Sequence, residues 1–66
     1  MTVNQYKDLD EAEQLEIVWL SEFLAQKSED GFLYELYYYQ NLFIEVQSSI
    51  TTKQYIKFTP MLEGWN

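Results

Sequence analysis

Glu35 and Glu45 are the two residues of this sequence whose types and spacing could perform acid–base chemistry. They lie in "FLYELYYYQNLFIEVQ", residues 32–47, each near the centre of a segment in which residue character alternates. If the two segments pair as a hairpin, the carboxylates face one another, and close carboxylates separate their pKa values into an acid and a base. A sheet this small offers no cleft for a substrate. We therefore predict solvated strand residues here and no catalytic residue.

The other reactive side chains lack the partners that catalysis or metal binding requires. The chain has no histidine to activate a serine and no cysteine to bind a metal or form a disulfide. Its two glycines cannot build a phosphate-binding loop. The acids at residues 8–16 lack the alternating spacing and the glycine of a calcium loop. We predict no metal and no cofactor.

Three aromatic residues, Tyr37, Phe43 and Tyr55, are candidates for an exposed cluster on the strands. Such rings could stack on bases, but the sequence has no arginine and its net charge of −7 repels phosphates. Tyrosine and tryptophan are enriched at protein interfaces. We therefore assign these rings, together with Glu35 and Glu45, to a surface for a protein partner and not for nucleic acid.

One amphipathic helix over residues 9–28 is expected to support these strands. Asp8 or Asp10 caps it, each with a glutamate three residues later. Its apolar residues form two stripes on opposite sides, and a sheet covers only one of them. The second stripe, Ile17, Leu20 and Leu24, is a candidate surface for self-association, unless the C-terminal residues Met61, Leu62 and Trp65 cover it.

After Gly31 the apolar period changes from 3.6 to 2, which predicts strands over residues 32–38, 42–48 and 53–59. A three-residue loop at 39–41 would place Tyr34 and Leu36 on the same face as Ile44, whereas a two-residue loop would exchange the faces. Pro60 is expected to end the last strand. The predicted fold is α+β: one N-terminal amphipathic helix on a three-stranded antiparallel meander with a short C-terminal turn. The predicted core combines residues from both parts: Leu15, Trp19, Phe23, Phe32, Leu36, Leu42, Ile44, Val46, Ile56 and Phe58.

The order of these features resembles that of short uncharacterised bacterial proteins. The resemblance covers roughly residues 8–63 and lies in the acidic helix, in "YELY" and "NLFIEV", and in the final strand closed by "PMLE". It implies a bacterial or phage origin. It brings no activity with it.

Size and composition complete the functional hypothesis. A single domain of 66 residues buries only about 60% of the surface of its unfolded chain, so self-association is a natural source of extra stability. No apolar run approaches the roughly 20 residues of a membrane span, and we expect a cytoplasmic protein without a membrane partner. The leading hypothesis is a non-enzymatic interaction module that forms a homodimer and binds another protein. The alternative is an acidic inhibitor, of the phage or mobile-element type, of an enzyme that handles nucleic acid; mimicry of nucleic acid is one way in which it could act.

Overall fold

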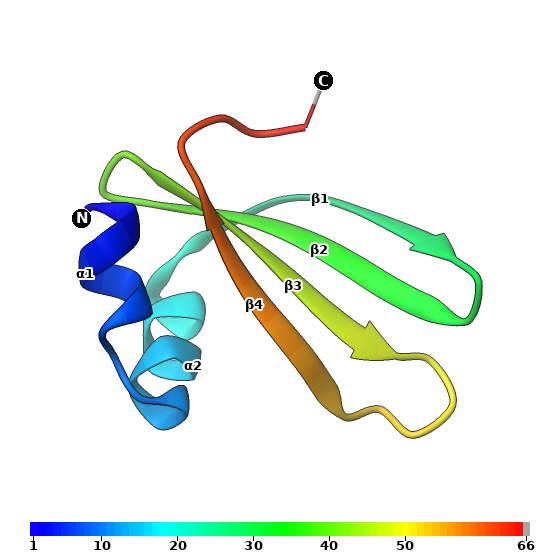
Figure 1. Ribbon diagram of the computed structural model, residues 1–66. Coiled ribbons are helices and arrows are strands. Elements are labelled where there is room, and N and C mark those ends of the chain that lie inside the picture. The colour runs from blue at the N-terminus through cyan, green and yellow to red at the C-terminus, as the bar shows by residue number, and fades with distance from the viewer. Residues whose placement is uncertain (66) are drawn as a thin grey trace.

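Two short helices and four strands make up the part of the chain that the structure describes. The computed structural model describes residues 1–65. The elements in chain order are α1 (Val3–Lys7), α2 (Glu11–Leu20), β1 (Glu22–Glu29), β2 (Phe32–Tyr39), β3 (Leu42–Ser49) and β4 (Tyr55–Met61). The strands form one antiparallel sheet in the order β1-β2-β3-β4, and the helices gather against one end of it (Figure 1).

The prediction of a single helix on a three-stranded meander is wrong in its N-terminal half. The helix ends at Leu20, and residues 22–29 form a fourth strand, β1. Asp30 and Gly31 both have positive φ, 53° and 86°, and Glu29 pairs directly with Phe32 across them. An Asp-Gly pair in this conformation is a two-residue hairpin turn, so Gly31 joins two strands instead of separating a helix from a strand.

Both helices begin with a reciprocal pair of hydrogen bonds. At α2, the Glu13 amide donates to Asp10 Oδ1 at 2.8 Å, and the Asp10 amide donates to Glu13 Oε1 at 3.2 Å. Asp10, rather than Asp8, is therefore the cap. Thr2 and Gln5 make the same arrangement at α1, a helix that the sequence analysis does not predict. Each pair satisfies two backbone donors that a helix start leaves free.

The β2–β3 turn has two residues, not the three that we predict. Gln40 and Asn41 both have positive φ, and Tyr39 pairs with Leu42. This register exchanges the expected faces, because side chains alternate along a strand. Leu36 now shares a face with Glu45, and Tyr37 shares the other face with Ile44.

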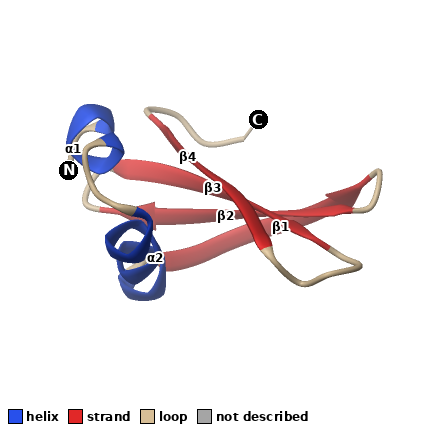
Figure 2. Ribbon diagram, turned by 60° about the horizontal axis from the view of Figure 1, so that its bottom comes forward, coloured by secondary structure: helices blue, strands red, loops and turns tan. Residues whose placement is uncertain are grey.

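The helix face of the sheet is the one on which α1 and α2 lie (Figure 2). On β3 its residues are Leu42, Ile44, Val46 and Ser48, all buried, while the alternate residues are only partly buried. Tyr6 of α1 and Val18 of α2 complete this core. The Tyr6 hydroxyl donates to the Gln14 carbonyl at 3.1 Å, which ties the two helices together.

The opposite surface, here the tail face, carries Leu36 and Phe43 and is crossed by the chain after β4. A Cβ added at Gly64 would lie 3.2 Å from the Phe43 ring, so the tail passes close to that ring. Trp65 Nε1 donates to Glu45 Oε2 at 2.8 Å. The expected C-terminal turn is thus an extended strap that covers part of the sheet.

The last strand and the core differ from the prediction in detail. β4 runs two residues further than residue 59 and includes Pro60, which is compatible with an edge strand because one side of its backbone needs no ladder bonds.

Three residues of the predicted core, Trp19, Phe23 and Ile56, are exposed. Tyr6 occupies the centre instead.

Candidate functional site

The junction between α2 and β1 presents the main exposed apolar surface of the described residues. Ser21 ends α2 with an extended backbone, its amide donates to the Val18 carbonyl at 3.1 Å, and its Oγ donates to the Ile17 carbonyl at 2.6 Å. The helix therefore passes directly into the strand. Four large apolar residues lie on either side of this junction and are exposed, and we call them the junction patch: Trp19, Leu20, Phe23 and Leu24.

The exposure of the junction patch is high for side chains of this kind. Trp19 is 72%, Leu20 64%, Phe23 49% and Leu24 42% exposed. Solitary exposed apolar residues are ordinary on protein surfaces, but four of them so close together in the chain are typical of an interaction site or an aggregation hazard.

The three residues predicted for self-association divide between this patch and the core. Leu20 and Leu24 belong to the junction patch, one at the end of α2 and the other in β1. Ile17 is partly buried and packs against the core beside Val18. The candidate surface is therefore not a helical stripe but the corner where helix and strand meet.

Three residues of the predicted partner surface lie on the helix face of the sheet: Glu35, Tyr37 and Tyr55. Tyr37 makes an edge-on contact with Phe23, with ring centroids 5.7 Å apart, and so connects the junction patch to the sheet. Burial raises the pKa of the Tyr37 hydroxyl, and the negative charge of the nearby Glu35 raises it further. The ring is thus a neutral, packed neighbour of the patch at physiological pH.

Phe43 and Glu45 lie on the tail face, apart from the other residues of the predicted partner surface. The Lys27 ammonium lies 4.8 Å from the centre of the Trp65 ring, within the range of a cation–π contact. Because Trp65 also binds Glu45, these residues hold the strap in place. The predicted partner surface is accordingly divided between two sides of the sheet.

The same register separates the two glutamates that could have formed an acid–base pair. Glu35 pairs with Val46, and Glu45 pairs with Leu36, so the carboxylates are on opposite faces of the sheet. Side chains on opposite faces cannot share a proton or a substrate. The candidate catalytic geometry is absent for this pair.

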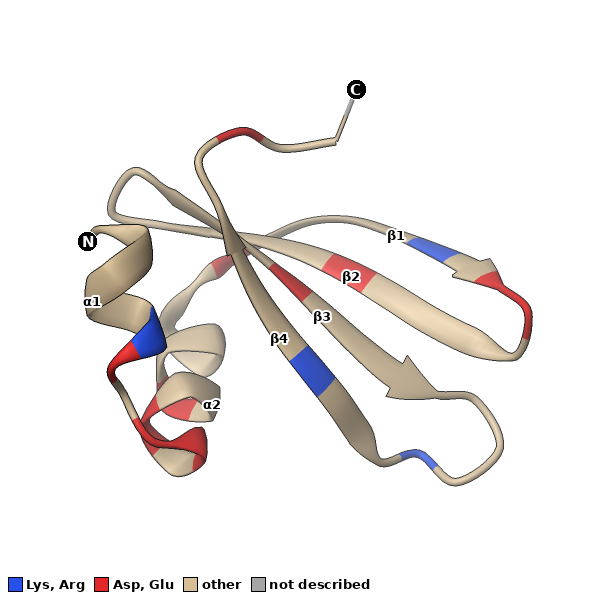
Figure 3. Cartoon of the chain, in the orientation of Figure 1, with Lys and Arg blue, Asp and Glu red and all other residues tan. Residues whose placement is uncertain are grey.

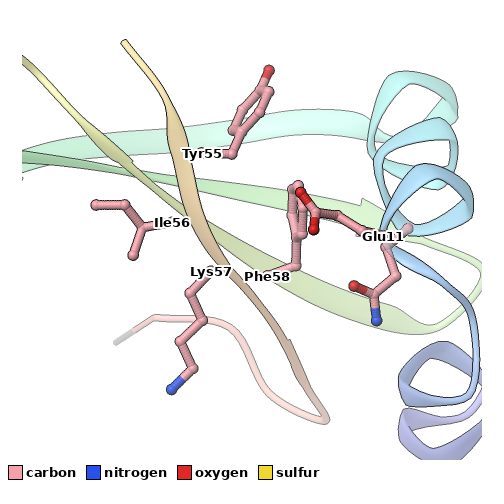
Figure 4. A pocket seen from close by; sticks show the side chains of 6 residues that line it. Glu11, Tyr55, Ile56, Lys57 and Phe58 are labelled. Carbon is pink, nitrogen blue, oxygen red and sulfur yellow. The ribbon is translucent and has the colours of Figure 1, made fainter. Parts of the chain in front are cut away.

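A shallow groove of about 350 Å³ separates α2 from β4. Figure 4 shows the side chains around it, with Glu11 on the helix side and Lys57 on the strand. The remaining lining is Gln14, Tyr55, Ile56 and Phe58. The Lys57 side chain points away from the helix, on the opposite side of β4 from Glu11 (Figure 4). The groove is therefore an open, partly apolar surface with one carboxylate beside it, which suits weak contact with a protein better than enclosure of a small molecule.

Neither metal binding nor membrane insertion is indicated by the described residues. In residues 1–65, no three side chains of the His, Cys, Asp and Glu types come together in a group that could hold a metal ion. Neither of the two helices in this part of the chain has the length and apolar character needed to cross a membrane.

Comparison of the chain with protein-family models, with curated proteins and with solved structures gives no match. The resemblance to short bacterial proteins therefore stays a prediction.

Only Leu20 and Leu24 of the junction patch are predicted as a surface, because residues 22–28 are assigned to a helix on the basis of the sequence. The signal that could have revealed β1 is Asp30-Gly31, a favoured hairpin turn, directly before the strand-like period of β2. With β1 recognised as a strand, Phe23 and Leu24 fall at its start and cannot continue the apolar stripe of α2.

Proposed function

We propose that this chain is a non-enzymatic protein-interaction module that self-associates through the junction patch. The observation that carries the proposal is that four large apolar side chains within residues 19–24 are exposed: Trp19, Leu20, Phe23 and Leu24. Removing such a surface from water stabilises an assembly by roughly 25 cal/mol per Å² of apolar area before the costs of association.

The size of the chain supports the same proposal. A domain of 66 residues without cysteine gains no stability from disulfides, and burial of an additional apolar surface between two copies supplies part of what is missing. Trp19 adds a large, rigid side chain of the type that contributes most at interfaces.

The test is the mass of the protein in solution, measured by light scattering behind size exclusion across a range of concentrations. We expect the wild-type mass to rise toward that of a dimer. Leu20→Glu places a charge in the patch, so this variant should remain monomeric at concentrations at least tenfold higher, with an unchanged circular dichroism spectrum. Leu62→Glu is the matched control, because Leu62 is also exposed but belongs to the strap; it should associate as the wild type does.

Two results would contradict the proposal. One is a wild-type chain that stays monomeric over the whole range. The other is a folded Leu20→Glu variant that associates as strongly as the wild type.

Inhibition of a nucleic-acid enzyme receives less support from the structure. Acidic residues surround the start of α2 but also lie on β2, β3 and the β1–β2 turn (Figure 3). Asp10 and Glu13 are engaged in the helix cap, and Glu45 binds Trp65. A mimic needs a row of free carboxylates on one surface, and here several have structural partners or face away. Binding that weakens steeply with salt would favour this alternative over the interaction module.

A further inference from the structure

β1 is an edge strand whose outer side has no neighbouring strand among the described residues. Seven of its eight residues are exposed, and only Ala25 is partly buried. Such an edge presents unpaired backbone donors and acceptors that can pair with another strand.

The opposite edge, β4, is protected in ways that β1 is not. Pro60 has no N–H to donate, and α1 packs beside this strand. The two edges therefore differ, and the junction patch lies at the edge that has neither a proline nor a helix packed beside it.

We propose that β1 pairs antiparallel with β1 of a second copy, which joins two sheets into one of eight strands. This inference rests on the proposed self-association and specifies its geometry. The occupant of the edge is another copy of this chain, because the charges along β1 attract those of a second β1 in one antiparallel register.

Twofold symmetry limits the possible registers. In an antiparallel pair the opposing side chains lie on the same face of the sheet. Leu24 is an extra residue in a bulge between Phe23 and Ala25, so Glu22, Ala25 and Lys27 all lie on the tail face, opposite Tyr38, Leu36 and Tyr34 of β2.

Charge then distinguishes the registers. With the twofold axis at Ala25, Glu22 of each copy lies opposite Lys27 of the second copy, which gives two attractive pairs. With the axis one residue later, at Gln26, Glu22 instead meets Glu29 of the second copy, and the like charges repel. With the axis at Phe23, the overlap is shorter, because α2 ends at Leu20.

Lys27 lies on the tail face, which is the face that the first register requires. Its ammonium is held over the Trp65 ring and lies 5.8 Å from the centre of the Tyr34 ring, both on the tail face. The same arrangement brings the two Leu24 side chains and the adjoining Phe23 residues close to the axis, so the ladder and the junction patch form one continuous interface.

Exchange of the two charges tests the register. Glu22→Lys alone and Lys27→Glu alone each replace two attractive pairs with two repulsive ones, and each should weaken the dimer by about tenfold or more. The double variant should recover the wild-type dissociation constant, measured by analytical ultracentrifugation. Glu29→Lys is the control, since this position has no charged partner in the proposed register.

The double variant also separates pairing from folding. Lys27→Glu removes the contact with Trp65 in both the single and the double variant, so recovery of the dimer in the double variant assigns the loss to the charge pair. If Leu20→Glu abolishes the dimer but neither charge reversal changes it, the β1 pairing is wrong and the proposed function stands. If the wild type does not associate, both are wrong.

A cysteine cross-link provides a second, independent measurement, because the chain has no cysteine of its own. Ala25→Cys lies at the axis, where the Cα atoms of facing residues are about 5 Å apart, within the range of a disulfide. Ser28→Cys, three residues away, would place the two sulfurs roughly 20 Å apart. Under mild oxidation we expect a covalent dimer from Ala25→Cys and not from Ser28→Cys. Equal cross-linking of the two variants would overturn the register.

Discussion

The two faces of the sheet are closed by different means. On the helix face, two capped helices cover Leu42, Ile44 and Val46, none of which has any exposed surface. On the tail face, a short extended strap crosses Leu36 and Phe43 and is held by Glu45 and Lys27. The first closure depends on dense apolar packing, while the second depends on a few polar contacts with one ring. We therefore expect most of the folding stability to come from the helix face.

The largest expected effect comes from a cavity on the helix face. Ile44→Ala removes buried methyl groups from the centre of the core, and such truncations lower the free energy of unfolding by about 2 to 5 kcal/mol. Urea denaturation followed by circular dichroism measures the loss. Ile44→Val, expected to cost about 1 kcal/mol, keeps the effect measurable if the alanine variant does not fold. The comparison of the faces fails if Ile44→Ala costs less than removal of the strap contacts.

The second prediction concerns Tyr6, which lies in the core on the helix face, and the change of the free energy of unfolding with pH. Burial raises the pKa of the Tyr6 hydroxyl to about 12 from its ordinary value of 10.0. The unfolded chain therefore loses this proton at lower pH than the folded chain does. The contribution of the protonated Tyr6 to the free energy of unfolding is therefore complete below pH 10. It is lost as the pH rises toward 12, and the free energy of unfolding falls by on the order of 2 kcal/mol.

Tyr6→Phe is the control for this effect. The variant loses the hydrogen bond to Gln14 and about 1 kcal/mol of stability at neutral pH. Compared with the wild type, its free energy of unfolding should change less between pH 10 and 12. Parallel pH profiles of the two proteins would show that burial of Tyr6 does not govern this range.

The smallest expected effect concerns the tail face. Trp65→Phe keeps an aromatic ring but removes the N–H that Glu45 accepts, and a loss of about 1 kcal/mol is expected for this partly buried hydrogen bond. Glu45→Gln in the same background should then add little, because the pair is already broken. Urea denaturation of the two single variants and the double variant measures this coupling. Additive losses would mean that the contact does not hold the strap.

Local signals along the chain predict several features correctly. The alternating pattern identifies the central hairpin, β2 and β3, within one residue at its ends. Asp10 and Glu13 have the spacing of a helix start and form it. These features depend on residues near one another in the sequence, where side-chain period and capping chemistry act directly.

Other features depend on partners that are distant in the sequence. "EFLAQK" contains residues that a helix accepts well, and only pairing with β2 makes it a strand. Gly31 can end a helix or complete a hairpin turn, and the same pairing decides between them.

The faces of the hairpin are decided in the same way. A turn of two residues requires Gln40 to adopt positive φ, which glutamine does not favour by itself, and the packing of Leu42, Ile44 and Val46 under the helices stabilises that register. The sequence by itself therefore determines where the central strands and the α2 cap lie. Only the tertiary structure decides that residues 22–29 form an edge strand, that Tyr6 is at the core, and which apolar residues stay exposed. The physical reason is that burial and strand pairing act between distant residues and outweigh small local preferences.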